Sequence, residues 1–176
     1  MKTQHIIVVR HNERWHAEWS IIRRRIVWRF EQSGIADCLV AVEHVGSTAV
    51  CGLWAKPILD VDLVYRTTED LPSVIEALQA LEYIDEGDLG IKNREAFTYR
   101  QLPGLMAHHL YACPQNSSEL NRHIVFRNYL QTHPEAVGEY SRVKREAAQR
   151  YPDDIENYMA YKAPVIEHIY QTCGLL

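Results

Sequence analysis

Two aspartates separated by a single residue are the part of the sequence whose types and spacing point most directly to chemistry. Asp60 and Asp62 lie within the apolar run 58–65, which alternates as a strand does. Side chains two apart on a strand point the same way, about 6.5–7 Å from each other, so both carboxylates can reach one divalent ion. Hard oxygen ligands select magnesium, manganese or calcium. The alternative is a polar strand face with two solvated aspartates. Carboxylates inside so apolar a run are unfavourable unless they are paired or bind a ligand.

A glycine–serine turn precedes the aspartates. The run 38–45 is short, apolar and rich in β-branched residues, which predicts a strand that ends at Gly46. Glycine lets a ligand approach the backbone closely, and Ser47 or Thr48 at a helix start leaves N–H groups pointing outward. We therefore expect an anion site, followed by a short helical segment that ends at Lys56 because a proline comes next.

Cations and histidines are the remaining candidates. Lys56 has the strongest local case, because it lies between the turn and the aspartates; the other cations, each a surface residue by default, are Arg94, Arg122, Arg127, Lys144 and Lys162. His44 precedes the turn, and of the neighbours His108 and His109 only one can face the site. Ordinary buried histidines are one alternative reading, and a zinc site of His44, His109 and Cys113 is another.

The elements that position these residues are both strands and helices. Residues 6–9 are expected to be a strand or an extended lead-in. The amphipathic stretch 13–32 predicts a helix that buries Trp15, Trp19, Ile22, Ile26 and Phe30. A second helix is predicted over 73–81, with a strand beginning at 83–84, a loop over 85–93, and strands 96–101 and 107–112 as an antiparallel hairpin beside the Asp60 strand.

The last third of the chain is predicted to be helical. After a capping segment at 116–119, prolines divide the sequence into helices 118–132, 134–150 and 153–172. Pro164 is expected to kink the last helix or split it near Lys162. The fold class is thus α+β: one domain, 1–176, with an α/β core over 1–115 and a helical segment over 116–176 packed on the sheet.

Composition excludes several classes of protein. The net charge of −4 argues against bulk attraction to nucleic acid, so we do not expect a nucleic-acid partner. The four cysteines form no C-x-x-C pair, which favours reduced thiols in the cytoplasm over a zinc ribbon or a redox motif. The apolar run 6–9 is far too short for a signal segment or a membrane span, so neither secretion nor membrane insertion is expected.

The stretch HVGSTAVCGLWAKPILDVDLV, residues 44–64, resembles the signature of the GrpB family, H-[IV]-G-S-T-[AS]-V-P-G-L-x-x-K-P-I-[IL]-D. The resemblance covers nearly the whole chain. Further segments that are similar to the family pattern are Arg94 to Phe97, Phe126 to Leu130 with His133-Pro134, Tyr140 with Lys144, and Tyr158 with Lys162.

Membership of this family implies a nucleotidyltransferase-like mixed sheet flanked by helices. In that superfamily a G-S turn holds nucleotide phosphates, and two acids in a D-h-D motif, with a third, bind magnesium for in-line attack on the α-phosphate. The resemblance therefore implies that Asp60 and Asp62 bind Mg²⁺ or Mn²⁺ and, with Lys56, are catalytic. The implied nucleotide- or phosphate-binding residues are His44, Gly46, Ser47, Thr48, Arg94, His109, Arg127, Lys144, Tyr158 and Lys162.

The chain departs from the superfamily pattern in one place that matters. The hairpin strand 107–112 carries no carboxylate where a third acid is expected, and Tyr111 replaces a histidine of the family pattern. Glu43, Glu95 or the substrate would have to complete a metal shell. Three hypotheses follow: a metal-dependent nucleotidyltransferase-like enzyme, an inactive module that binds a nucleotide or a CoA-like ligand, and a structural or partner-binding protein. Substrate and oligomeric state stay open.

Overall fold

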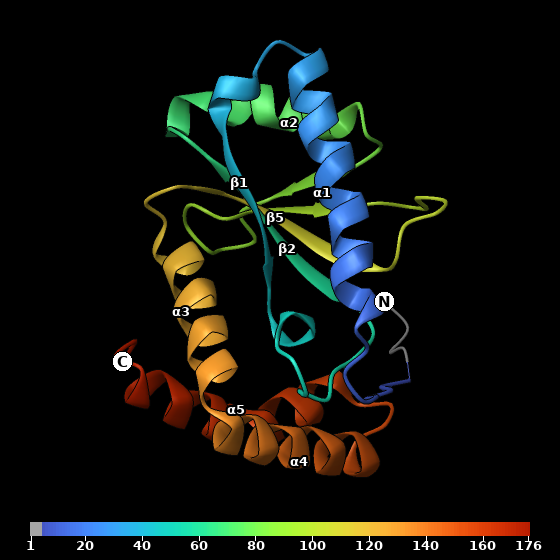
Figure 1. The fold of residues 1–176 in the computed structure, drawn as a ribbon, viewed down its shortest axis with the longest axis vertical. Coiled ribbons are helices and arrows are strands. Elements are labelled where there is room, and N and C mark those ends of the chain that lie inside the picture. Colours follow the sequence, from blue (N-terminus) through green and yellow to red (C-terminus); the bar gives the residue numbers. More distant parts are fainter. Residues whose placement is uncertain (1–4) are drawn as a thin grey trace.

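The fold consists of one mixed sheet, helices on its two faces, and a pair of helices across one end (Figure 1). A computed structural model describes residues 5–176. Its main elements are α1 (Arg14–Gln32), β1 (Leu39–Val45), β2 (Leu59–Tyr65), α2 (Leu71–Gln79), β3 (Ile84–Gly87), β4 (Glu95–Thr98), β5 (His108–Pro114), α3 (Ser118–Thr132), α4 (Pro134–Arg150) and α5 (Ile155–Thr172). Among the described residues no helix is long and apolar enough to span a membrane.

The sheet has five strands in the order β1-β2-β5-β4-β3. β1 is antiparallel to β2, β2 is parallel to β5, and β4 is antiparallel to both β5 and β3. The predicted α+β class, the mixed sheet and the hairpin beside the Asp60 strand are confirmed. In this register Asp60 lies opposite His109 and Asp62 lies opposite Tyr111.

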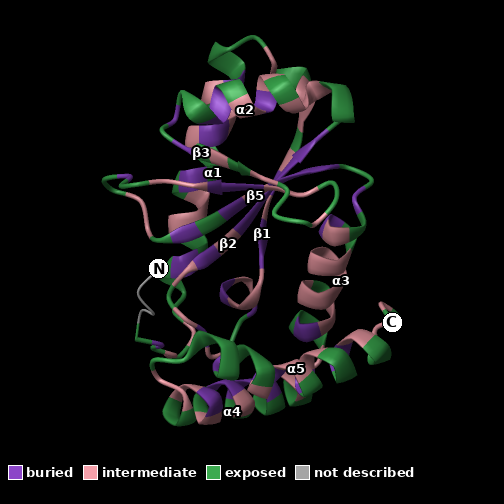
Figure 2. Ribbon diagram, turned by 180° about the vertical axis from the view of Figure 1, so that it is seen from behind, coloured by how far each residue is buried: buried purple, intermediate pink, exposed green. Residues whose placement is uncertain are grey.

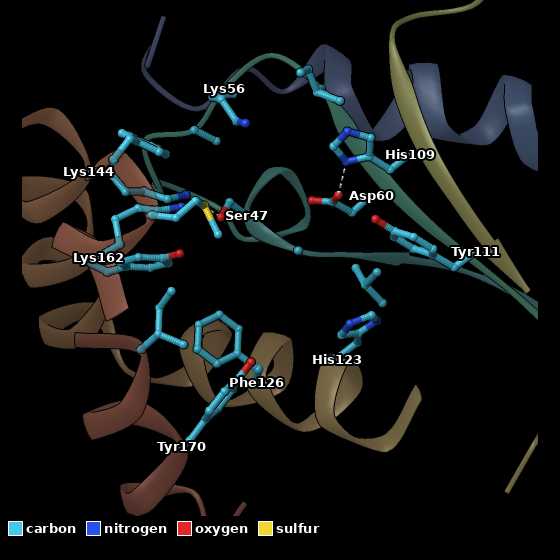
Figure 3. A pocket seen from close by; sticks show the side chains of 18 of the residues that line it. Ser47, Lys56, Asp60, His109, Tyr111, His123, Phe126, Lys144, Lys162 and Tyr170 are labelled. Carbon is cyan, nitrogen blue, oxygen red and sulfur yellow. Dashed lines mark hydrogen bonds and ion pairs between the residues drawn. The ribbon is translucent and has the colours of Figure 1, made fainter. Parts of the chain in front are cut away.

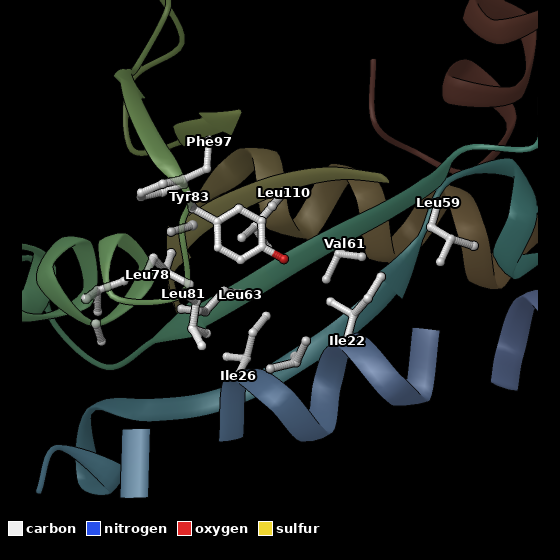
Figure 4. Packing of buried hydrophobic residues seen from close by; sticks show 14 of the residues in the cluster. Ile22, Ile26, Leu59, Val61, Leu63, Leu78, Leu81, Tyr83, Phe97 and Leu110 are labelled. Atoms are coloured by element: carbon white, nitrogen blue, oxygen red, sulfur yellow. The ribbon is translucent and has the colours of Figure 1, made fainter. Parts of the chain in front are cut away.

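The main core lies between the sheet and the helices α1 and α2. Ile22 and Ile26 of α1 pack against Val61 and Leu63 of β2, and all four side chains are fully buried (Figure 4). Because side chains alternate along a strand, burying the odd-numbered residues of β2 sends the even-numbered ones to the opposite face. Asp60 and Asp62 therefore face away from this core.

The opposite face of the sheet is covered by α3, and α4 and α5 cross its end (Figures 1 and 2). Val64 and Cys113 of the sheet pack with Leu120 of α3. The last two helices pack chiefly on the segment that joins β1 to β2, where Val50 and Leu53 form a second cluster with residues of α3, α4 and α5. The segment that carries the glycine–serine turn is thus held between the sheet and the C-terminal helices.

Several element boundaries differ from the predictions. The segment after Gly46 is a single 3₁₀ turn, Ser47–Ala49, rather than a longer helix. β3 continues to Gly87, into the stretch predicted as a loop, because it pairs with β4. In the lead-in, only Val9 makes a β-bridge, to Ala55, so residues 6–9 are extended rather than a strand of the sheet.

Of the two effects expected of Pro164, a kink or a split near Lys162, the split is wrong. α5 runs without interruption from Ile155 to Thr172 and contains Pro164. Proline removes one backbone hydrogen bond, but buried residues on both sides, Tyr158 and Lys162 before it and Val165 and Ile169 after it, hold the helix against its neighbours. Tertiary packing therefore outweighs the local preference.

Candidate functional site

A pocket of about 300 Å³ opens where β2 and β5 meet the three C-terminal helices. Figure 3 shows Lys144 and Lys162 on one side of this pocket, Asp60 and His109 on the other, and Ser47 between them. The polar side chains that line it are Ser47, Lys56, Asp60, Arg94, His109, Tyr111, His123, Tyr140, Lys144, Tyr158, Lys162 and Tyr170. Most of the residues predicted for the site therefore lie around one cavity.

Asp60 is fixed against the backbone of the glycine turn. Gly46 has a φ of 68°, and a Cβ atom at this position would lie 2.2 Å from Oδ2 of Asp60. The absence of a side chain at residue 46 is thus what allows the carboxylate to approach the turn. The other oxygen, Oδ1, lies 3.0 Å from Nδ1 of His109, and the Asp60 side chain is 34% exposed.

Asp62 occupies a different environment on the same face of β2. Its side chain is fully buried, Oδ2 lies 2.7 Å from Nδ1 of His123, and Oδ1 has no hydrogen-bond partner among residues 5–176. Burial raises the pKa of Asp62. Burial alone would lower the pKa of His123, but the hydrogen bond and charge of Asp62 outweigh it, and the pKa of His123 is raised. His123, rather than Asp62, lines the pocket.

Three lysines converge on the turn from the other side. Nζ of Lys144 contacts Oγ of Ser47 and donates to the carbonyl of Trp54 at 3.1 Å. Burial, together with the charge of Lys56, lowers the pKa of Lys162 to about 8. Burial and the charge of Lys162 hold the pKa of Lys144 well below its usual range. No recorded ion pair of residues 5–176 joins any of the three to a carboxylate.

Aromatic rings form the rest of the wall. Phe126 of α3 lies edge-on to Tyr170 and Tyr140, with ring centroids 5.3 Å and 6.0 Å apart. On the sheet side, the guanidinium of Arg94 lies 4.5 Å from the centroid of the Tyr111 ring. The pocket thus combines a cationic end, an acidic edge and an apolar, aromatic wall, which is a common composition for sites that bind small molecules.

His44, Thr48 and Arg127 are not brought to this pocket. His44 points to the α1 face, where it stacks on Trp19 with centroids 5.7 Å apart and lies 2.9 Å from the buried hydroxyl of Thr48. Strand alternation explains this, because Val45 lines the pocket and its neighbour must face the other way. Arg127 instead binds Glu43 at 2.7 Å and the carbonyl of His44 at 2.9 Å.

Some lining residues were not predicted as part of the site. His123 and Phe126 come from α3, and Tyr170 comes from α5. The spacing of three residues between His123 and Phe126 places both on one helix face, which is a signal that the sequence contains. Tyr170 has no such signal, because its position depends on how α5 packs across the others.

The site partly fits a divalent cation. Within residues 5–176 no group of three or more histidine, cysteine, aspartate or glutamate side chains is placed to hold a metal ion, which leaves the zinc alternative without support. Asp60 and Asp62 nevertheless share a face, and the orphaned Oδ1 of Asp62 is a buried acceptor without a donor. Magnesium is commonly held by one or two carboxylates, with substrate phosphates and water completing its shell, and two carboxylates are what this site offers.

Comparison with known proteins assigns the family. The model of a family described as "GrpB protein" matches residues 5–172. The chain belongs to the GrpB family. It is 27% identical to the crystal structure of the conserved protein GrpB from Enterococcus faecalis, with a TM-score of 0.78 over 94% of this chain and 98% of that one. It is also 29% identical to UPF0157 protein YqkA of Bacillus subtilis over 88% of this chain, and it spans 43% of that protein's length.

The fold of this GrpB-family chain is also similar to that of a nucleotidyltransferase-like protein. A structure of Cid1 in complex with its short product ApU superposes with a TM-score of 0.53, covering 78% of this chain and 40% of that one. The sequences are only 9% identical, so this likeness concerns the fold alone.

Replacing Gly46 with alanine should destabilise this GrpB-family chain more than the same change at Gly34. Both glycines have a φ near +70°, but the ψ of −165° at Gly46 lies in a region that is open almost only to glycine, and only at residue 46 does a Cβ meet the Asp60 carboxylate. We expect Gly46→Ala to lower the free energy of unfolding by about 1–3 kcal/mol more than Gly34→Ala, measured by urea denaturation. Equal losses would contradict the close contact with Asp60.

Protonation of His44 should lower the free energy of unfolding in acid. Burial, aided by the charges of His16 and Arg127, lowers the pKa of His44 to about 4. A histidine with a lowered pKa stabilises the fold fully above its unfolded value of 6.5, and this contribution is lost as the pH falls toward 4. At about 1.4 kcal/mol per pKa unit, the wild type should lose about 3 kcal/mol more than His44→Gln between pH 7 and pH 4. The exposed His168→Gln control should behave as the wild type, and a parallel loss in His44→Gln would refute the assignment.

Proposed function

We propose that this GrpB-family protein binds a nucleotide or another phosphate-containing small molecule in the pocket between β2 and the C-terminal helices. In this proposal Mg²⁺ or Mn²⁺ lies at Asp60 and Asp62, and the protein acts in the manner of a nucleotidyltransferase. The nucleotidyltransferase-like fold of Cid1 supports the general class. The phosphates would lie at Gly46 and Ser47, flanked by Lys56 and Lys162.

The observation that carries this proposal is a group of three lysines, none of which forms an ion pair with a carboxylate among residues 5–176. Lys162 is only 6% exposed. Burying its ammonium group without a paired carboxylate is unfavourable, and the neighbouring charge of Lys56 increases the cost. A polyanionic ligand in the pocket removes this penalty, since its oxygens accept hydrogen bonds from the ammonium groups and neutralise their charge.

The aspartate pair supplies a second, weaker support. Asp60 and Ser47 line the same cavity, and Oδ1 of Asp62, on the same face of β2, is buried without a hydrogen-bond partner among residues 5–176. A divalent cation bound there would supply Lewis-acid polarisation of a phosphoryl oxygen. Lys56 would neutralise charge on the leaving phosphate, while His109 orients the Asp60 carboxylate through the 3.0 Å contact.

One observation favours a second candidate, a module that binds the same class of ligand without catalysis. The strand position opposite Asp62 carries Tyr111, and Asp62 itself is engaged by His123. Metal-dependent release of pyrophosphate from nucleoside triphosphates, in the presence of a metabolite extract that supplies acceptors, separates the two. Release that disappears in Asp60→Asn identifies an enzyme, whereas binding without release identifies the module.

Removing either Lys56 or Lys162 from the pocket should weaken the binding of a polyphosphate. We expect Lys56→Met and Lys162→Met each to raise the Kd for ATP by about tenfold or more, because a hydrogen bond to a charged group contributes about 1.5–3 kcal/mol. Isothermal titration calorimetry measures this directly. The exposed Lys92→Met is the matched control and should bind ATP as the wild type does. An unchanged Kd for ATP in both pocket variants would contradict the proposal.

The divalent-cation site should depend on both aspartates. Titration of the ligand-free protein with Mn²⁺, followed by electron paramagnetic resonance, should show weak binding that is strengthened by ATP. Asp60→Asn and Asp62→Asn should each abolish that strengthening. Asp37→Asn, which changes an exposed acid in the turn before β1, should not. Mn²⁺ binding that is identical in all four proteins would place the metal elsewhere.

A further inference from the structure

Phosphate binding does not require the contact between the Ser47 hydroxyl and the Lys144 amine. Ser47 begins the 3₁₀ turn after Gly46, is only partly buried and lines the pocket. Lys144 comes from the middle of α4, and its Nζ lies at hydrogen-bond distance from the Ser47 hydroxyl. Lys144 and Lys162 both line the pocket, but Nζ of Lys144 is held by the serine, a contact that an amine needed only for anion binding would not require.

The surroundings of Lys144 favour a neutral amine. Its side chain is almost fully buried, and no carboxylate pairs with it among residues 5–176. Burial and the neighbouring charge of Lys162 lower the pKa of Lys144, as noted above. A desolvated lysine beside another cation is an established way of obtaining a free amine near neutral pH.

The geometry also orients that amine. A neutral amine has two N–H groups and one lone pair, and one N–H is used by the Trp54 carbonyl at 3.1 Å. The remaining contact, to Ser47, allows the hydroxyl to donate its proton to the lone pair. A serine whose proton is shared with a neutral lysine has the arrangement of a serine–lysine catalytic dyad.

We propose that Ser47 is a nucleophile in this pocket and that Lys144 is its general base. The electrophile is a tetrahedral phosphorus atom of the bound anion, which rests on the function proposed above. The Oγ–P bond forms as the bond from phosphorus to its leaving group breaks, the leaving group departs with the electron pair, and the hydroxyl proton passes to Nζ of Lys144. Lys56 and Lys162 stabilise the negative charge on the phosphoryl oxygens. The product is a covalent phosphoserine-type ester, which transfer to a second acceptor would release.

A purely structural role for Lys144 is the competing explanation, because α4 must be tied to the β1–β2 connection. The chain contains a second tie of this kind. The hydroxyl of Ser141, one helical turn before Lys144, accepts from the backbone N–H of Trp54 at 3.1 Å. Ser141 is buried and does not line the pocket. It therefore provides a matched control for loss of anchoring without loss of a base.

The test is covalent labelling of the full chain with a fluorophosphonate, whose attack by Ser47 forms an Oγ–P bond and expels fluoride. Intact-mass spectrometry gives the rate, and peptide mapping gives the site. We expect a single adduct at Ser47 in the wild type, and none there in Ser47→Ala. We expect Lys144→Met to slow labelling by about 10²-fold or more, and Ser141→Ala to label at close to the wild-type rate. Circular dichroism verifies that each variant is folded.

Two outcomes would overturn the proposal. One is a wild-type labelling rate no higher than that of Lys144→Met, and the other is an adduct distributed over several serines. Should Lys144→Met fail to fold, the pH dependence of wild-type labelling decides instead, because the rate must rise as Lys144 loses its proton. Lys162, Lys56 and Asp60 face the same amine, and a parallel profile of Lys162→Met separates the titration of Lys144 from that of Lys162. Calorimetry with ATP is independent of this reaction. Binding without labelling would refute the nucleophile alone, and labelling without binding would refute the phosphate ligand alone.

Discussion

The alternation of side chains along β2 is the constraint on which the site depends. Leu59, Val61 and Leu63 are fully buried against α1 and α2, so the residues between them must face the C-terminal helices. The pairing of β2 with β5 then sets which groups accompany the aspartates, and a slip of one residue would exchange the two faces. The hydrophobic core therefore fixes the register, and the register places Asp60 beside His109 at the pocket.

The buried lysines destabilise the fold locally, and apolar packing in the rest of the helical segment offsets this loss of stability. Two lysine amines are buried close to each other, yet the fold around them is well packed: Leu53 of the β1–β2 connection is enclosed by Tyr140, Val165 and Ile169. Burial of such side chains contributes about 1.5–3 kcal/mol each, which is enough to hold α4 and α5 in place although they carry these buried lysines. Apolar residues at the lysine positions would serve stability better, so these positions indicate function.

The sequence alone predicted those parts of the fold that depend on local pattern. The spacing of Ile22, Ile26 and Phe30 predicted α1 and its buried face, and the two prolines at 134 and 152 placed the later helix breaks close to where they occur. The joining of α4 and α5 to the glycine turn depends on long-range packing, and no short-range pattern specifies it. His44 was assigned to the pocket because it precedes the glycine turn and belongs to the family signature, although strand alternation, applied to Val45, would have sent it to the face of α1.

Asp60 and Asp62 have different exposures and contacts although their side chains lie on the same face of β2. Asp60 is partly exposed and touches the glycine turn, so a ligand at Ser47 meets it directly. Asp62 has one oxygen committed to His123 and one without a partner. In the function proposed above, a cation held by Asp62 would use Oδ1, while the contact of Oδ2 with His123 would keep the carboxylate in a fixed orientation. Because Asp60 lines the pocket and Asp62 does not, a ligand entering the pocket would meet Asp60 first.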